Sequence, residues 1–212
     1  MNRARSYTWL FWGVAMLGLA LDQTTKYGIF AHLYNEGRGG EIEVIPSAFK
    51  LLAQYTPQKE TGDGFTSRLR TVSGETLPCV NRGALFGMGG GRNTLFAVVS
   101  VAAALAIIYW SSRPLTRTDG YLCLALGLIL AGTLGNLYDR LVFSGVRDFF
   151  YWYYAVDWPV FNVADVCLVC GAALLLVQAF FTHPHVEYQD SAAPGSTEPV
   201  RLAQGAEVLE AK

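Results

Sequence analysis

Charged residues are scarce in this sequence. They make up 16% of its 212 residues, and 52% of the residues are hydrophobic, whereas a soluble globular domain usually contains about 25% charged residues. This deficit indicates a membrane protein. The formal net charge is only −1, so the chain has no excess of positive charge with which to bind nucleic acid.

Cysteine and histidine are also rare. Of four cysteines, Cys123, Cys167 and Cys170 lie within apolar runs, and only Cys79 stands in a polar stretch. A disulfide framework needs paired cysteines in a wet, oxidising segment, so we interpret these residues as small apolar side chains. The three histidines form no cluster with metal-ligand spacing, and we expect neither a metal site nor a cofactor.

Four long apolar runs are present, at about 8–30, 94–110, 121–137 and 160–181. About 20 residues cross a bilayer as a helix, and a spanning segment must satisfy its own backbone hydrogen bonds. The alternating pattern of a membrane β-barrel is absent. The first run could instead be a cleaved secretory signal peptide, but it continues past Asp22 and Lys26 without a clean small-x-small cleavage site. The sequence therefore predicts an all-α integral membrane protein with four transmembrane helices.

The distribution of arginine predicts the orientation of these spans. Arg3 and Arg5 precede the first run, and Arg113 and Arg117 lie in the short 111–120 connection. An even number of spans places both termini on the same side as that connection, and the positive-inside rule makes this side the cytoplasm. The predicted membrane domain covers 1–182, and the polar 183–212 segment is predicted to be a disordered cytoplasmic tail.

The long connection at 31–92 is predicted to lie outside the cytoplasm. Residues 41–55 partly alternate in polarity as a strand does, and 79–88 form a second candidate extended stretch. Between them, 56–78 is polar and rich in Thr, Gly and Pro, which is typical of a mobile loop. We expect a small β-sheet on the outer membrane surface.

Ionisable residues within membrane spans mark functional sites by default. Asp22 and Lys26 are one helical turn apart in the first run and can pair, either as a structural pair or in support of a site. Asn136 lies near the end of the third run, where a buried amide needs a partner. Asp139 and Arg140 follow it and could be a plain interfacial charge pair.

Two further aspartates stand in unusual surroundings. Asp148 lies in a connection but is followed by Phe149, Phe150 and the sequence YWYY, an aromatic cluster typical of a membrane interface. Asp165 is predicted to lie several residues inside the fourth helix, with Pro159 at the start of that helix. A carboxylate there needs a partner or a water-filled cleft in order to stay ionised. Asp148 and Asp165 can therefore act as a pair at the membrane surface.

Five motifs follow one another along the chain, each beside an expected span: LDQTTK at 21–26, NRGALFG at 81–87, GNLYDR at 135–140, VRDF at 146–149 and FNVAD at 161–165. Together they resemble the bacterial lipoprotein signal peptidase family, also called signal peptidase II. The resemblance covers about 8–181. Two departures stand out: a polar insertion at 56–78, and Arg147 at a position that is more often small or apolar, which we expect to point outward.

The resemblance implies an aspartyl endopeptidase of the bacterial cell membrane, with an extracytoplasmic β-cradle and a substrate that is a diacylglyceryl-modified prolipoprotein. Cleavage would occur just before the modified cysteine, and membrane lipids would be the only other partners. The catalytic aspartates fall on Asp148 and Asp165. The positions that support substrate and catalysis fall on Asp22, Lys26, Asn81, Gly83, Asn136, Asp139, Arg140, Asn162 and Ala164.

The residues themselves leave other function classes open. A proton or ion transporter would also need intramembrane carboxylates, although a relay should cross the bilayer rather than gather toward one surface. A membrane assembly factor could use polar residues only to join helices. Another class of intramembrane aspartyl protease is less well supported, because a GxGD-type signature is missing from the sequence.

Overall fold

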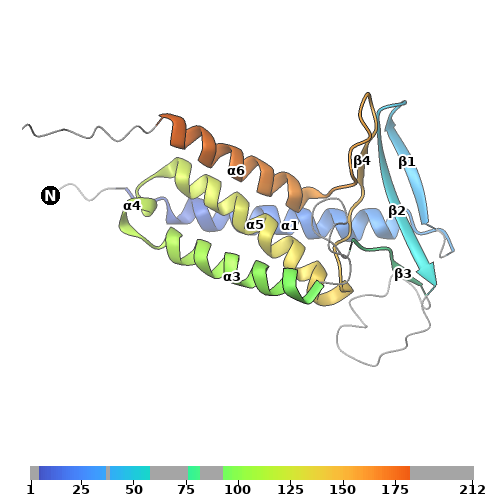
Figure 1. Cartoon of the computed structure of the whole chain (residues 1–212), viewed down its shortest axis with the longest axis horizontal. Helices are drawn as coiled ribbons and strands as arrows, with labels where there is room; N and C mark the ends of the chain where they lie inside the picture. The colour runs from blue at the N-terminus through green and yellow to red at the C-terminus, as the bar shows by residue number, and fades with distance from the viewer. Residues whose placement is uncertain (1–4, 37–38, 58–75, 82–92, 182–212) are drawn as a thin grey trace, which may run out of the picture. The chain divides into compact units, whose positions relative to one another are not determined.

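Four long helices dominate the structure, a computed structural model that describes residues 5–36, 39–57, 76–81 and 93–181. They run side by side in Figure 1, and the predicted tail at 183–212 lies outside the described residues. A helix covers each predicted apolar run, but the third continues beyond 137 and the fourth begins later than 160. The helices are α1 (Thr8–His32), α3 (Asn93–Ser111), α5 (Gly120–Phe143) and α6 (Val163–Phe181), with the short α4 (Pro114–Arg117) between α3 and α5.

Three of the described helices, α3, α5 and α6, are long and apolar enough to cross a membrane. Helix α1 has 25 residues, a length of about 37 Å at about 1.5 Å per residue, which exceeds a hydrocarbon core of about 30 Å. It is less apolar than the other three, because it carries Asp22 and Lys26 in its second half. Its length fits the predicted span, whereas its lower apolar content distinguishes it from α3, α5 and α6.

Helix α5 is the central helix and packs against α1, α3 and α6. Glycines on its surface allow this close packing. A Cβ atom on Gly132 would collide with the backbone oxygen of Ala164 in α6, and one on Gly127 would lie 2.8 Å from the backbone oxygen of Phe11 in α1. Close approach through small residues is the usual way in which membrane helices gain packing contacts.

A four-stranded antiparallel sheet lies at one end of the helices (Figure 1). Its strands are β1 (Gly39–Ile45), β2 (Phe49–Pro57), β3 (Thr76–Pro78) and β4 (Phe150–Trp152). Strand β1 pairs with one edge of β2, while β4 and β3 pair in succession with the other edge. The expectation of a small sheet is confirmed, and β2 is the strand that joins its parts.

Two predictions about the 31–92 connection need correction. The alternating stretch at 41–55 is a hairpin rather than one strand, because the chain turns at 46–48, where Ser47 has a φ of 58°. The ends of the predicted loop at 56–78 belong to β2 and β3, and 58–75 lie outside the described residues. In the predicted stretch at 79–88, Asn81 forms an isolated bridge with Val146, and 82–88 lie outside the described residues.

A buried cluster joins the sheet to α1. Phe30 of α1 and Leu33, which follows the end of that helix, pack with Ala53 and Tyr55 of β2 and with Phe149. The Tyr55 hydroxyl donates a hydrogen bond to the backbone oxygen of Phe30. Phe149 is fully buried, so the residue that follows Asp148 is anchored at the junction between sheet and helix.

Candidate active site

Asp148 lies in an extended segment between α5 and β4. On one side of it, Val146 exchanges two backbone hydrogen bonds with Asn81, at 2.8 and 2.9 Å. On the other side, the Phe149 backbone N–H donates to the Phe161 carbonyl at 3.1 Å. Because the residues flanking Asp148 are held by their own backbone bonds, the position of its carboxyl group is fixed by the fold.

Asp165 lies in the first turn of α6, not several residues inside the helix as predicted. The Asn162 side-chain oxygen accepts a bond from the Asp165 backbone N–H, and the Asp165 carboxyl accepts one from the Asn162 backbone N–H, both at 3.1 Å. This reciprocal pattern is a capping box. Pro159 does not start the helix, because Phe161 is still paired with the sheet, and Asn162 is the stronger N-cap.

Three asparagine side chains connect the two aspartates. The Asn162 amide nitrogen donates to Asp148 Oδ1 at 2.7 Å and lies 3.3 Å from Asn136 Oδ1. The Asn136 amide nitrogen donates to Asp165 Oδ1 at 2.9 Å. The Asn81 amide nitrogen donates to Asp148 Oδ2 at 3.2 Å. The two carboxyl groups, which come from different parts of the chain, thus belong to one hydrogen-bonded group.

Both carboxyl groups are half-buried. Burial raises the pKa of Asp148 to about 7, and the neighbouring Asp165 charge also raises it, whereas hydrogen bonds from Asn162 and Asn81 lower it. Beside the charge of Asp165, the carboxyl group of Asp148 therefore loses its proton less readily than it would alone. The arrangement offers one group that accepts a proton and one that donates a proton, near neutral pH.

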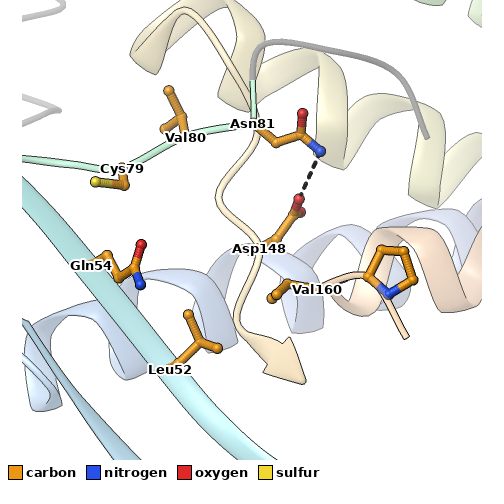
Figure 2. A pocket seen from close by; sticks show the side chains of 8 residues that line it. Leu52, Gln54, Cys79, Val80, Asn81, Asp148 and Val160 are labelled. Atoms are coloured by element: carbon orange, nitrogen blue, oxygen red, sulfur yellow. Dashed lines mark hydrogen bonds between the residues drawn. The ribbon is translucent and has the colours of Figure 1, made fainter. Parts of the chain in front are cut away.

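A cavity of about 380 Å³ opens beside Asp148. Figure 2 shows Leu52 and Gln54 on β2 across the cavity from Asp148, which is bonded to Asn81. No ionisable group marks Leu52 or Gln54 in the sequence, so sequence reasoning missed this wall. The lining residues come from β2, from the segment after β3 and from the segments around α6 and β4: Leu52, Gln54, Cys79, Val80, Asn81, Asp148, Pro159 and Val160.

Behind the two aspartates lies a second polar group, which we call the sealed cluster: Asp22, Lys26, Asp139, Arg147 and Gln23. Lys26 Nζ is 2.9 Å from the Asp22 carboxylate and 3.5 Å from that of Asp139. Arg147 Nη2 is 2.8 Å from Asp139 and donates to the Gln23 side-chain oxygen at 3.0 Å. All four charged residues are buried, and their charges cancel, as burial of ions requires.

The expectation that Arg147 points outward is wrong. Its side chain is 1% exposed, and its guanidinium lies between the rings of Tyr27 and Phe143, 4.1 and 4.0 Å from their centroids. Asp139 binds Arg147 and Lys26. The physical reason is that the chain turns back after α5, which brings Arg147 over the last turns of that helix.

Arg140 lies beside the two aspartates and also contacts α3. Its guanidinium stands 5.4 Å from the Phe96 ring centroid, and its backbone oxygen accepts a bond from the Asn93 side chain at 3.0 Å. The carboxylates of Asp148 and Asp165 are its strongest electrostatic neighbours. Arg140 is therefore a positive charge beside the pair of aspartates.

Direct contacts join the sealed cluster to the aspartate pair. Lys26 Nζ donates to Asn136 Oδ1 at 3.2 Å, and the Ala164 backbone N–H donates to Asp22 Oδ1 at 2.9 Å. Gly135 permits this arrangement, because a Cβ atom there would lie 2.5 Å from Asp22 Oδ2. All of the described residues that the resemblance assigns to the site lie in these two groups or, in the case of Arg140, beside the pair, and Gly83 lies outside the described residues.

Metal-ligating side chains do not gather into a metal site in the described part of the chain, where no three His, Cys, Asp or Glu residues are close enough together to hold an ion. The chemistry that the described side chains offer is that of two linked carboxyl groups and their amide partners.

Comparisons with known proteins find relatives in sequence and in fold. The family model described as signal peptidase (SPase) II matches residues 69–181. A lipoprotein signal peptidase from Rhodopirellula baltica is 36% identical over 211 residues, which cover 92% of this chain and 83% of that protein. One from Pseudomonas syringae pv. tomato is 40% identical over 176 residues, covering 81% and 85%.

A solved bacterial membrane enzyme has the same fold, with a TM-score of 0.68 at 23% identity, over 90% of this chain and 100% of that one. The matched family region contains α3, α5 and α6 together with both aspartates. The chain belongs to the signal peptidase (SPase) II family.

Proposed function

We propose that this protein is a membrane aspartyl endopeptidase that removes signal peptides from prolipoproteins by cleaving before a diacylglyceryl-modified cysteine. Asp148 and Asp165 are its catalytic pair. The observation that carries the proposal is the link through Asn162, whose side chain bonds Asp148 at 2.7 Å and closes the capping box of Asp165 at 3.1 Å. Its relatives are named lipoprotein signal peptidases, which supplies the reaction and the class of substrate.

The reaction needs one proton shared between the two carboxyl groups, which titrate together. We place it on Asp148, whose pKa is raised to about 7 by burial. The carboxylate of Asp165 takes a proton from water, and the water oxygen attacks the scissile carbonyl carbon. The protonated Asp148 stabilises the oxygen that becomes negative. When the carbon–nitrogen bond breaks, the leaving amine takes up a proton from the pair.

The remaining site residues serve the pair in two ways. Asn81, Asn136 and Asn162 hold the carboxyl groups directly. Arg140 lies near both carboxylates and is suited to hydrogen-bond the substrate backbone. The sealed-cluster residues Asp22, Lys26 and Asp139, with the backbone of Ala164, hold α1, α5 and α6 together behind the pair. Gly83 enters this proposal through the family motif alone.

Four membrane spans, with α1 as the first, fit this activity. The Tyr7 backbone N–H donates to the Arg117 carbonyl at 2.7 Å, so the N-terminal segment lies beside the arginine-bearing connection. The positive-inside rule then assigns that end, with both termini, to the cytoplasm of a bacterial cell. The sheet and the catalytic pair lie at the opposite, extracytoplasmic end, where exposed Trp152 and Trp158 suit a membrane interface.

The substrate enters from the bilayer. Its lipid-modified cysteine and its signal helix stay in the membrane, and the peptide segment around the scissile bond occupies the cavity beside Asp148. The cavity volume of about 380 Å³ lies within the usual range of about 300–1,000 Å³ for small binding sites. It accommodates a short peptide segment rather than a folded domain.

The test is incubation of the purified enzyme with a diacylglyceryl-modified prolipoprotein. We expect cleavage before the modified cysteine, read by mass spectrometry, and loss of at least about 10²–10⁴-fold in rate for Asp148→Asn and for Asp165→Asn. Both variants should unfold at temperatures close to that of the wild type. Near-wild-type cleavage by either variant would show that the pair is not catalytic.

The same preparation separates the rival function classes. A transporter would move protons or ions when reconstituted in vesicles and would leave the prolipoprotein intact. An assembly factor would lose stability in the two Asp→Asn variants and would show no cleavage in any variant. The proposed peptidase gives cleavage in the wild type and loss of cleavage in folded variants.

A further inference from the structure

Arg147 and Asp148 are adjacent in the chain, but their side chains point to opposite sides of the segment. Asp148 lines the cavity (Figure 2). Arg147 is not among the residues that line the cavity, and its side chain is buried between Tyr27 and Phe143. Successive side chains of an extended segment point to opposite faces. The inward side chain of Arg147 therefore fixes the direction in which Asp148 points.

Several hydrogen bonds to Asp139 and Gln23 fix the side chain of Arg147. Asp139 Oδ2 accepts bonds from the Arg147 backbone N–H at 2.8 Å and from its Nε at 3.2 Å, and Oδ1 accepts one from Nη2 at 2.8 Å. Gln23 accepts a further bond from Nη2 at 3.0 Å. A planar guanidinium that binds both oxygens of a carboxylate has a fixed orientation, which a lysine ammonium does not reproduce.

The geometry points to Arg147 as a positioning residue of the proposed peptidase: by clamping its own segment onto Asp139, it sets the depth and direction of Asp148 and neutralises the buried charge behind the catalytic pair. This inference rests on the proposed roles of Asp148 and Asp165. It assigns a task to the residue at which the sequence departs from the usual small or apolar side chain.

The charge of Arg147 matters as much as its shape. The sealed cluster contains two anions, Asp22 and Asp139, and two cations, Lys26 and Arg147. Loss of the Arg147 charge leaves one uncompensated negative charge, in contact with the network that reaches the catalytic pair. A nearby negative charge favours the protonated form of a carboxyl group. The pH range in which the pair holds one proton then moves upward.

Other charged and titratable groups face Arg147 and the pair, and their side chains are chemically the same in the wild type and in the Arg147 variants. They lie on α1, β2, α5 and α6 and, for Asp148, on the segment before β4. Arg147 binds Asp139 through its backbone N–H, Nε and Nη2, so loss of the Arg147 charge acts most directly on Asp139. Among the described residues they include Asp22, Lys26, Tyr27, Tyr55, Tyr138, Asp139, Arg140, Asp148 and Asp165.

The experiment measures kcat and KM on a diacylglyceryl-modified prolipoprotein from about pH 5 to about pH 9, with the full-length enzyme in detergent. The variants are Arg147→Met and Arg147→Lys. The matched control is Arg113→Met, which removes an exposed arginine that stacks on Tyr109 at 5.4 Å, outside the site. Asp148→Asn is measured alongside them, because activity in that variant would overturn the catalytic pair itself rather than the role of Arg147.

We expect Arg147→Met to lower kcat by about 10-fold to 100-fold, as misplacement of a catalytic group does, with KM changed less than about 3-fold. Its pH profile should move upward by at least about half a unit. Arg147→Lys should restore the profile, because it restores the charge, but only part of kcat. Arg113→Met should match the wild type.

Wild-type kcat per folded molecule, with an unmoved pH profile in Arg147→Met and an inactive Asp148→Asn, would overturn the inference and leave the proposed function standing. If Arg147→Met does not fold, the charge-balanced double variant Arg147→Met/Asp139→Asn replaces it. A lowered kcat with a wild-type profile in that variant supports the inference. A wild-type kcat overturns it.

Discussion

Two groups of acidic residues lie in contact in this protein, and their carboxyl groups differ in partners and in burial. In the sealed cluster, Asp22 and Asp139 are fully buried and are paired with cations at 2.8–3.5 Å. In the proposed catalytic pair, Asp148 and Asp165 are half-buried and accept hydrogen bonds from amide and backbone N–H groups, with Arg140 as a neighbouring positive charge. The two groups therefore differ both in burial and in the side chains that bind their carboxyl groups.

This difference has a direct chemical meaning. A carboxylate matched by a lysine or arginine stays ionised and serves structure, because its charge is compensated where it stands. The carboxyl group of Asp148 holds its proton more firmly than an ordinary carboxyl group does, because burial raises its pKa to about 7, although hydrogen bonds from Asn162 and Asn81 lower it. Helices α1 and α5, with Arg147 of the segment before β4, supply the paired charges, whereas Asp148 of that segment and Asp165 at the start of α6 form the proposed catalytic pair.

The largest effect on stability should come from the sealed cluster. Lys26→Met leaves Asp22 and Asp139 without a shared cation, and we expect a loss of about 3–5 kcal/mol in the free energy of unfolding, since a broken buried pair leaves an uncompensated charge. Unfolding in detergent measures this loss.

The control for Lys26→Met is Glu41→Gln, which breaks the more exposed Lys50–Glu41 pair. An exposed pair contributes at most about 1 kcal/mol, so this variant should unfold nearly as the wild type does. Equal losses in the two variants would remove the distinction between sealed and exposed charges.

A smaller effect, of opposite sign, should come from the catalytic pair. The pKa of Asp148 is about 7 in the fold, against an ordinary value of 3.8, so the folded state binds this proton more tightly than the unfolded chain does. Its stabilising contribution is complete below about pH 3.8 and is lost as the pH rises through about 7. Asp148→Asn should therefore flatten this dependence and stabilise the protein at pH 8, by on the order of 1–2 kcal/mol.

Thermal unfolding of wild type and Asp148→Asn at several pH values provides the measurement. The matched variant is Asp139→Asn, which should destabilise the protein at every pH because its carboxylate is bound to cations. A wild type that is no less stable at pH 8 than at pH 5, relative to Asp148→Asn, would contradict the elevated pKa.

Asn162 caps α6 and also donates a hydrogen bond to Asp148, and two substitutions can separate these two roles. Asn162→Ser keeps an N-cap but loses the amide that donates to Asp148. We expect stability within about 0.5 kcal/mol of the wild type and a kcat lower by about 10-fold. Asn162→Ala loses both functions and should also lose about 1 kcal/mol of stability. Chemical unfolding and steady-state kinetics measure the two losses, and normal kcat in Asn162→Ser would show that the bridge to Asp148 has no catalytic value.

The sequence was sufficient for much of this molecule. Long apolar runs predicted the four helices, because a run of that length has few other structures in a membrane. The five motifs led to both aspartates. The inward direction of Arg147 was out of reach, since the face on which an extended residue lies depends on what its neighbours pack against, here the buried Phe149.

The start of α6 was missed for a related reason. Pro159 and Asn162 are both acceptable helix starts by sequence. Pairing of Phe161 with Phe150 in the sheet decides between them, and that contact is a property of the fold. The capping box of Asn162 and Asp165, with its three-residue spacing, was the one local signal that would have favoured the correct start.

The smallest effect should come from the cavity wall opposite the pair. Gln54 lies on β2 across the cavity from Asp148 (Figure 2), where its exposed amide can bond the substrate backbone but cannot reach into the sealed cluster. A single neutral hydrogen bond contributes about 1 kcal/mol, so Gln54→Ala should raise KM by about 3-fold to 5-fold and leave kcat unchanged, as loss of uniform binding does. Steady-state kinetics separate the two constants. A lowered kcat at unchanged KM would instead place Gln54 with the groups that act in the transition state. The catalytic groups would then include a residue of β2 as well as the pair of aspartates.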